Sequence, residues 1–167
     1  MECLKKFRLL NNRQKAYISS KIDFELEMMS HEQDSENMLD VLVLTGNMED
    51  GMVLDSANEE RIYCPEYIKK YGERLHCGIR ITSNHLNPVY VRNDILGISK
   101  KPPRDGDTCI LVHKPTGRAF IRKLQQGNPC HLLPINGYGD IITVDTNDHT
   151  DIEQWLKFGV VIAVLRR

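Results

Sequence analysis

No apolar run in the 167 residues approaches the roughly 18 residues that a bilayer-spanning helix needs. The opening segment, MECLKKFRLLNNRQK, has no apolar stretch of the kind found in a secretory signal peptide. We therefore expect a protein without a membrane partner and with a cytoplasmic location. Its 41% hydrophobic content is enough for a real core in one globular domain with an appendage.

Paired cysteine motifs are also missing. The five cysteines are Cys3, Cys64, Cys77, Cys109 and Cys130, an odd number without a CxxC spacing. Neither a disulfide framework nor a zinc site is indicated, and we expect reduced, mostly buried thiols. Cys130 and His131 next to His113 are the nearest approach to a metal cluster, but adjacent residues on a strand point to opposite faces. We expect no metal and no cofactor.

Lysine and arginine are absent from residues 23–60, although the whole chain is nearly neutral with a formal net charge of -1. The preceding segment is basic, with Lys5, Lys6, Arg8, Arg13, Lys15 and Lys21. Such blocks mark solvated or interacting surface. One interpretation is a solvated helix followed by an acidic linker. The other is nucleic-acid contact through Lys5, Lys6, Arg8, Arg13 and Lys15.

Apolar residues from Glu2 to about Met29 recur mostly at three- or four-residue steps, which predicts an amphipathic helix, interrupted once near Asn11. Its apolar stripe could dock on a partner or a second copy, or pack on its own domain. No second and third helix follow to form a helix-turn-helix. The polar segment SHEQDSEN, residues 30–37, predicts a linker. We therefore divide the chain into residues 1–37, a helix and acidic linker, and residues 38–167.

Short apolar runs separated by turn residues predict a mainly β domain after this boundary. A helical turn or two is expected at residues 66–74. The expected strands are residues 41–44, 61–65, 76–82, 108–112, 119–124, 131–136, 141–144 and 158–167.

The central stretch RITSNHLNPVYVRNDILGISK, residues 80–100, has the cadence of a strand, a turn and a second strand. It is followed by Gly106-Asp107, by Leu133-Pro134 with Asn136, and by a closing strand. This series of landmarks over residues 41–167 resembles the LexA-like self-cleaving repressor peptidases and the related UmuD-type proteins. The resemblance implies a LexA-like C-terminal domain, of the β-clip type, built from short twisted antiparallel strands.

The chemistry of that family is not matched by the residues. His85 stands where the family has its nucleophilic serine, and Arg122 stands where it has its lysine base. A serine-lysine dyad needs a neutral amine to take the hydroxyl proton, whereas a guanidinium stays protonated at ordinary pH. We expect no enzymatic activity and no catalytic residue.

Three alternatives remain open. Lys123 could replace the lysine, although a one-residue shift would turn every side chain of its strand to the other face. Ser83 could use His85 as its base, without an evident acid to orient the imidazole. His85 and Arg122 could face each other and bind an anion or a carboxylate.

Asp50-Gly51 is the nearest counterpart of the bond that the family cuts. A charged Asp would have to be desolvated in a narrow cleft, at a cost of several kcal/mol, so this place is unsuited to cleavage. The simpler interpretation is a hairpin turn.

The expected function is a non-cleaving LexA-like module that dimerises and acts in transcriptional regulation, as in phage or mobile-element repressors and the SOS response. Its apolar closing strand suits an edge or interface strand through Val160, Val161, Ile162 and Val164. One alternative is a UmuD-like accessory factor or antirepressor that binds a related repressor or a polymerase-type partner without DNA contact. Another is an active self-cleaving peptidase.

Overall fold

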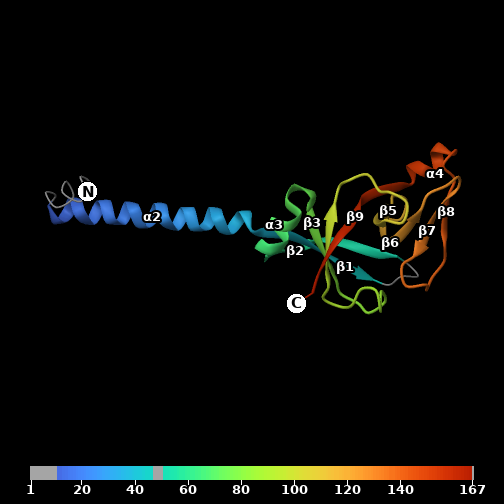
Figure 1. Ribbon diagram of the computed structural model, residues 1–167, viewed down its shortest axis with the longest axis horizontal. Helices are drawn as coiled ribbons and strands as arrows, with labels where there is room; N and C mark the ends of the chain where they lie inside the picture. Colours follow the sequence, from blue (N-terminus) through green and yellow to red (C-terminus); the bar gives the residue numbers. More distant parts are fainter. Residues whose placement is uncertain (1–10, 47–50, 167) are drawn as a thin grey trace. The chain divides into compact units, whose positions relative to one another are not determined.

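The computed structural model describes residues 11–46 and 51–166, and the chain divides into two units, Met1–Met38 and Leu39–Arg167 (Figure 1). The first unit contains helix α2 (Asn12–Glu36). Asn11 caps it, because its Oδ1 accepts a hydrogen bond from the backbone N–H of Gln14 at 2.9 Å. The side chain of Gln14 in turn accepts from the N–H of Asn11 at 3.0 Å. This reciprocal capping explains why the helix starts where the apolar spacing was interrupted.

Helix α2 continues to Glu36, so the prediction of a linker is wrong for residues 30–36. Tyr17, Ile22 and Leu26 are exposed large apolar residues of this helix. Ile22 and Leu26 lie five and nine positions after Tyr17, which places them about 140° and about 180° away around the helix. Ile18, Ile22 and Leu26, spaced four residues apart, therefore share one face of the helix, whereas Tyr17 lies on another.

The second unit is a β domain, and with 45% strand and 20% helix the chain is mainly β, as predicted. Its helical elements are short: α3 (Pro65–Tyr71), the 3₁₀ turn η1 (Gly72–Arg74) and α4 (His149–Glu153). The strands are β1 (Met38–Gly46), β2 (Met52–Tyr63), β3 (Cys77–Ile81), β4 (Ile95–Ser99), β5 (Thr108–His113), β6 (Arg118–Gln125), β7 (Cys130–Pro134), β8 (Ile142–Val144) and β9 (Trp155–Leu165).

The nine strands of the described residues belong to one mixed sheet with the order β2-β1-β3-β4-β9-β5-β6-β7-β8. β1 runs parallel to β3, whereas the pairs from β3 to β8 along this order are antiparallel. An additional pairing joins β2 to β6, where Met52 lies opposite Ala119. This pairing closes the sheet, so β2, β1, β3, β4, β9, β5 and β6 form a ring in this order. Strands β7 and β8 extend the sheet beyond β6.

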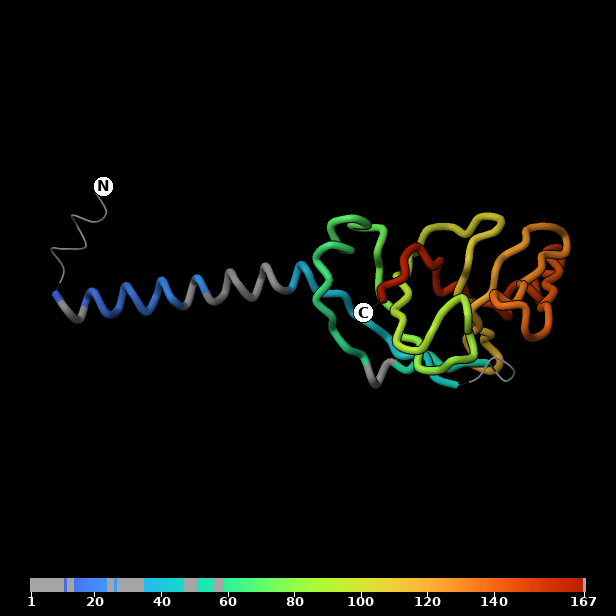
Figure 2. The backbone as a smooth tube through the Cα atoms, turned by 60° about the horizontal axis from the view of Figure 1, so that its bottom comes forward, coloured from blue at the N-terminus to red at the C-terminus, as the bar shows by residue number. Residues whose placement is uncertain are grey.

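Strand β9 is an interior strand, which corrects the prediction of an exposed edge. It pairs with β4 on one side and with β5 on the other (Figures 1 and 2). Val160 is 1% exposed, and Val161, Ile162 and Val164 are half-buried. Because both rows of its backbone hydrogen-bonding groups are used, β9 has no free edge for a second copy over these residues.

Three groups of buried side chains form the core. The first lies inside the ring and includes Ile79, Leu96 and Ile121. A second, around Val41 and Leu165, is covered by the tyrosines of α3. The third is formed by Cys109, Leu111, Leu132, Val144 and Val160. It comes from β5, β7, β8 and β9, where the sheet extends past the ring.

Over the described residues, no helix combines the length and the apolar character that crossing a bilayer requires.

Candidate functional site

The loop between β3 and β4, residues 82–94, carries His85 and Ser83 (Figure 1). Leu86 and Tyr90 are buried and anchor this loop in the core, while the side chain of His85 is exposed. The side-chain amide of Asn136 donates hydrogen bonds to the carbonyl oxygens of His85, at 2.8 Å, and of Asn87, at 3.2 Å. Asn136 follows β7, so the loop is held by a turn far away in the sequence.

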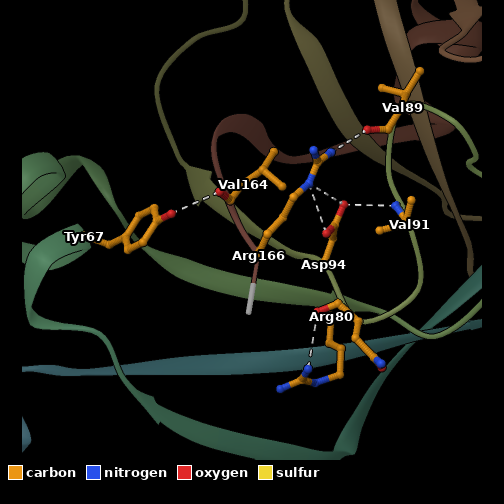
Figure 3. A network of polar contacts seen from close by, with 8 residues as sticks. Tyr67, Arg80, Val89, Val91, Asp94, Val164 and Arg166 are labelled. Carbon is orange, nitrogen blue, oxygen red and sulfur yellow. Dashed lines mark hydrogen bonds and ion pairs between the residues drawn. The ribbon is translucent and has the colours of Figure 1, made fainter.

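A polar network fixes the end of the same loop (Figure 3). The carboxylate of Asp94 is 3% exposed and accepts a hydrogen bond from the backbone N–H of Val91 at 2.9 Å. Its Oδ1 lies 3.3 Å from the Nε of Arg166, and the Nη2 of Arg166 donates to the carbonyl of Val89 at 3.2 Å. The loop conformation therefore depends on a residue that follows β9.

Arg122 lies on β6 and is 3% exposed. Its guanidinium lies 5.5 Å from the ring centre of Phe120, and its Nη1 donates to the carbonyl of Ile121 at 3.1 Å. Burial lowers the pKa of Arg122 from its ordinary value, and the negative charge of Asp140 opposes this change. Because a guanidinium stays protonated at ordinary pH, the side chain offers charge and hydrogen bonds near neutral pH, but no base.

Arg122 lines a cavity of about 360 Å³ together with His113, Phe120, Gly139, Asp140, Ile142 and Trp155. His85 is not among the lining residues. The anion site that we expected between His85 and Arg122 is therefore not formed by this cavity. Its single acidic member, Asp140, already lies close enough to influence the charge of Arg122.

The two fallback residues do not form a dyad in the described part of the chain. Lys123 pairs with Thr108 and Leu133 across the sheet, and its side chain is exposed. It is thus not the buried amine that a lysine base requires. Ser83 is half-buried, and no hydrogen bond joins it to His85. A serine peptidase needs a hydroxyl that is hydrogen-bonded to a base, and neither Lys123 nor His85 provides this for Ser83.

Gly51 lies against β6, whereas Asp50, the other half of the predicted cleavage place, is outside the described residues. The backbone of Gly51 has a φ of +80°, and a Cβ there would approach the Cβ of Arg118 and the Cζ of Phe120 to 2.8 Å. Phe120 is the ring beneath the guanidinium of Arg122. Gly51 is therefore packed close to the stacked pair of Phe120 and Arg122.

The basic residues of the opening segment are only partly described. Lys5, Lys6 and Arg8 lie outside the described residues. Arg13 and Lys15 belong to the beginning of α2, where Lys15 is half-buried. A nucleic-acid contact through these five residues stays a prediction.

Groups of three or more metal-ligating side chains do not occur in the described parts of the chain. Cys130 and His131 lie on β7, where His131 Nδ1 lies 3.2 Å from the hydroxyl of Thr143. His113 on β5 instead lies 2.9 Å from the hydroxyl of Thr116. The ring nitrogens thus have separate partners in different parts of the sheet.

A larger cavity, also bordered by Trp155, is one that the sequence did not indicate. It has a volume of about 870 Å³ and opens over the third core cluster. Its apolar lining includes Leu111, Leu132, Val144 and Trp155, and three lysines, Lys100, Lys101 and Lys157, also line it. The lining residues come from strands that are far apart in the sequence. The only local feature that pointed to this cavity was the basic pair Lys100-Lys101 before Pro102-Pro103.

Comparison with known protein families and with curated proteins gives no match for this chain.

Proposed function

We propose that the chain is a non-cleaving interaction module of the LexA-like type, acting in transcriptional regulation as a homodimer in the cytoplasm. The observation that supports this proposal best is Arg122, a buried guanidinium at the place where the resembled family has its lysine base. A group that stays protonated can hold a carbonyl or a carboxylate, but it cannot activate a hydroxyl. The rest of the fold is then retained for binding.

The surroundings of Arg122 support a binding role over catalysis. Its charge is stacked on Phe120 and bonded to the backbone of Ile121, so the side chain has a fixed place in the sheet. The exposed His85 is carried by a loop that Asn136 holds at His85 and Asn87 and that Arg166 holds near its end. A fixed loop next to a ring of strands provides a rigid surface on which another protein can dock.

A second candidate, a UmuD-like accessory factor or an antirepressor without DNA contact, is favoured by helix α2. Tyr17, Ile22 and Leu26 are 68%, 52% and 59% exposed on this helix. Large apolar side chains at the surface are typical of docking sites for protein partners. Before β1 the described residues form this one helix. A helix-turn-helix requires at least a second helix, which binds in the major groove of DNA.

Incubation at alkaline pH tests the absence of cleavage. A self-cleaving LexA-like repressor serves as the positive control, with and without an activated recombinase filament on single-stranded DNA. We expect one intact band for this chain in every condition, also after R122K, because the serine is still lacking. Fragments that separate near Asp50-Gly51 would overturn the proposal and favour an active peptidase.

Two further measurements separate the regulator from the accessory factor. Light scattering after gel filtration measures the mass, for which we expect a dimer. A mobility shift on duplex DNA over a salt series tests the basic segment, because phosphate contacts weaken steeply with salt. Salt-sensitive binding supports the regulator, whereas a complete lack of binding at low salt supports the accessory factor.

A further inference from the structure

The cavity of about 870 Å³ has an almost entirely apolar floor. Cys109, Leu132, Val144 and Val160 are buried members of the third core cluster and also line this space. Trp155, at the start of β9, forms part of the wall. Cavities of about 300–1,000 Å³ with such walls are the usual binding sites of small organic ligands.

Positive charge accompanies this apolar floor. Lys100, Lys101 and Lys157 line the cavity and are exposed, and the Nζ of Lys101 lies 3.3 Å from the carboxylate of Asp107. Burial raises the pKa of the Cys109 thiol to about 11, Asp107 acts in the same direction, and the charges of Lys157 and Lys101 oppose it. Lys157 lines the cavity from β9, where it lies opposite Leu111 of β5.

The acidic groups nearby are engaged by other partners. The carboxylate of Asp107 accepts a hydrogen bond from the backbone N–H of Arg104 at 2.9 Å, besides its contact with Lys101. That of Asp151, which influences Cys130 on the floor, accepts from the N–H of Asp145 at 2.7 Å. Among the described lining residues there is no Asp or Glu, so the charge of the lining itself is positive.

We propose that this cavity binds a single-chain amphiphile with an anionic head group, such as a medium-chain fatty carboxylate. The aliphatic chain lies on the third core cluster, where it is removed from water. The carboxylate lies among the three ammonium groups and is held chiefly by Lys157 and Lys100. The cavity thereby provides both parts of the ligand with a matching surface.

An extended peptide fits the same space less well. Each residue of a peptide brings a backbone N–H and C=O that must be hydrogen-bonded when they are buried. The polar side-chain groups along the cavity are few, and besides the lysines and the indole N–H of Trp155 they are those of Gln126 and Thr146. The alkyl chain of a fatty carboxylate has no such groups. All polar atoms of this ligand are in the carboxylate head group.

The fluorescence of Trp155 reports binding directly, because it is the single tryptophan of the chain. Dodecanoate is titrated below its micellar concentration, and dodecanol is the uncharged control ligand. We expect a saturable change for dodecanoate with a stoichiometry of one by calorimetry, and binding of dodecanol weaker by at least about tenfold.

Two matched variants test the role of the charged residues. K157E weakens dodecanoate binding by at least about tenfold and leaves dodecanol binding unchanged, since only the ionic contact is lost. K114E, at an exposed lysine that does not line the cavity, leaves both affinities unchanged. Circular dichroism verifies that both variants are folded.

Four outcomes overturn the proposal, and the first three are no saturable change for the wild-type chain, equal affinities for the two ligands with no effect of K157E, and a stoichiometry well above one. A dodecanoate affinity that falls as the protein concentration rises also overturns it, because a second copy of the chain then covers the cavity. None of these results depends on whether the chain cleaves itself.

Discussion

The buried carboxylate of Asp94 and the guanidinium of Arg166 join two parts of the chain that are 72 positions apart. Asp94 closes the loop that carries His85, and Arg166 is the last described residue after β9 (Figure 3). Because Arg166 also reaches the carbonyl of Val89, one side chain holds both the end and the middle of this loop.

Arg166→Ala is expected to lower the free energy of unfolding by about 1–2 kcal/mol, because it removes the ionic partner of the buried Asp94 carboxylate and leaves the hydrogen bond from the N–H of Val91. The range is modest because Arg166 itself is largely exposed. Urea unfolding measures the change. Arg61→Ala is the control, since its ion pair with Asp40 is exposed on both sides, and it should change stability by less than about 0.5 kcal/mol. Equal effects of the two variants would contradict a special role of Arg166.

Gly51→Ala is expected to destabilise the fold more than Gly117→Ala. Both glycines have positive φ, +80° and +66°, so each substitution carries a backbone cost of about 1 kcal/mol. Only at Gly51 does the added Cβ meet Arg118 and Phe120, which adds about 1–3 kcal/mol for overpacking. Thermal or urea unfolding of the two variants measures the difference, and equal losses of stability would show that Gly51 has room for a side chain.

Asp107 is expected to contribute to the acid dependence of stability. The backbone N–H of Arg104 lowers the pKa of Asp107 below its ordinary value of 3.8, burial opposes this effect, and Lys101 adds to it. A lowered pKa in the folded state means that the ionised carboxylate stabilises the fold above the unfolded-state value. That contribution is lost as the pH falls through the folded-state value, below 3.8.

The difference in urea midpoint between the wild type and Asp107→Asn should therefore shrink as the pH falls from neutral to below 3.8. Glu66→Gln, on the exposed side of α3, is the control and should show a small difference at every pH. A difference in urea midpoint between the wild type and Asp107→Asn that stays constant down to strong acid would refute the contribution of Asp107 to acid-dependent stability.

Cys77 and Cys109 are expected to resist thiol reagents in the folded protein. Burial raises the pKa of each thiol to about 11, so the thiolate is scarce at pH 8. With an aromatic disulfide reagent, C77S and C109S should each leave the rapid native-state labelling unchanged and remove one thiol from the total measured in denaturant. A smaller rapid phase in either variant would mean that the thiol is reactive in the fold.

Much of the β domain could be predicted from local sequence. The expected strands at residues 108–112 and 119–124 agree with β5 (Thr108–His113) and β6 (Arg118–Gln125) within one residue at each end. Short apolar runs with a turn between them are a local signal, and Gly117 has the positive φ that such a turn uses. The helical turns expected at residues 66–74 coincide with α3 and η1.

Two elements were missed because their signals are not local. Most of β2, whose sequence is MVLDSANEERIY, has no regular apolar alternation, and its strand conformation depends on β1 beside it and on the pairing of Met52 with β6. The second half of α2 is polar and acidic, which predicted a linker. Helix formation is cooperative, so a helix that is well capped at Asn11 can continue through residues that are polar.

The sequence by itself determined the chemistry that is possible at positions 85 and 122, because an imidazole and a guanidinium have their properties in any fold. It also determined where most strands begin and end, since turn residues and apolar runs act over a few neighbours. The tertiary structure alone decided that β9 lies between β4 and β5 and that Lys157 and Trp155 share a cavity with Lys100 and Leu132. Strand order and burial are set by the packing of residues distant in the chain, and no local pattern encodes which of them meet.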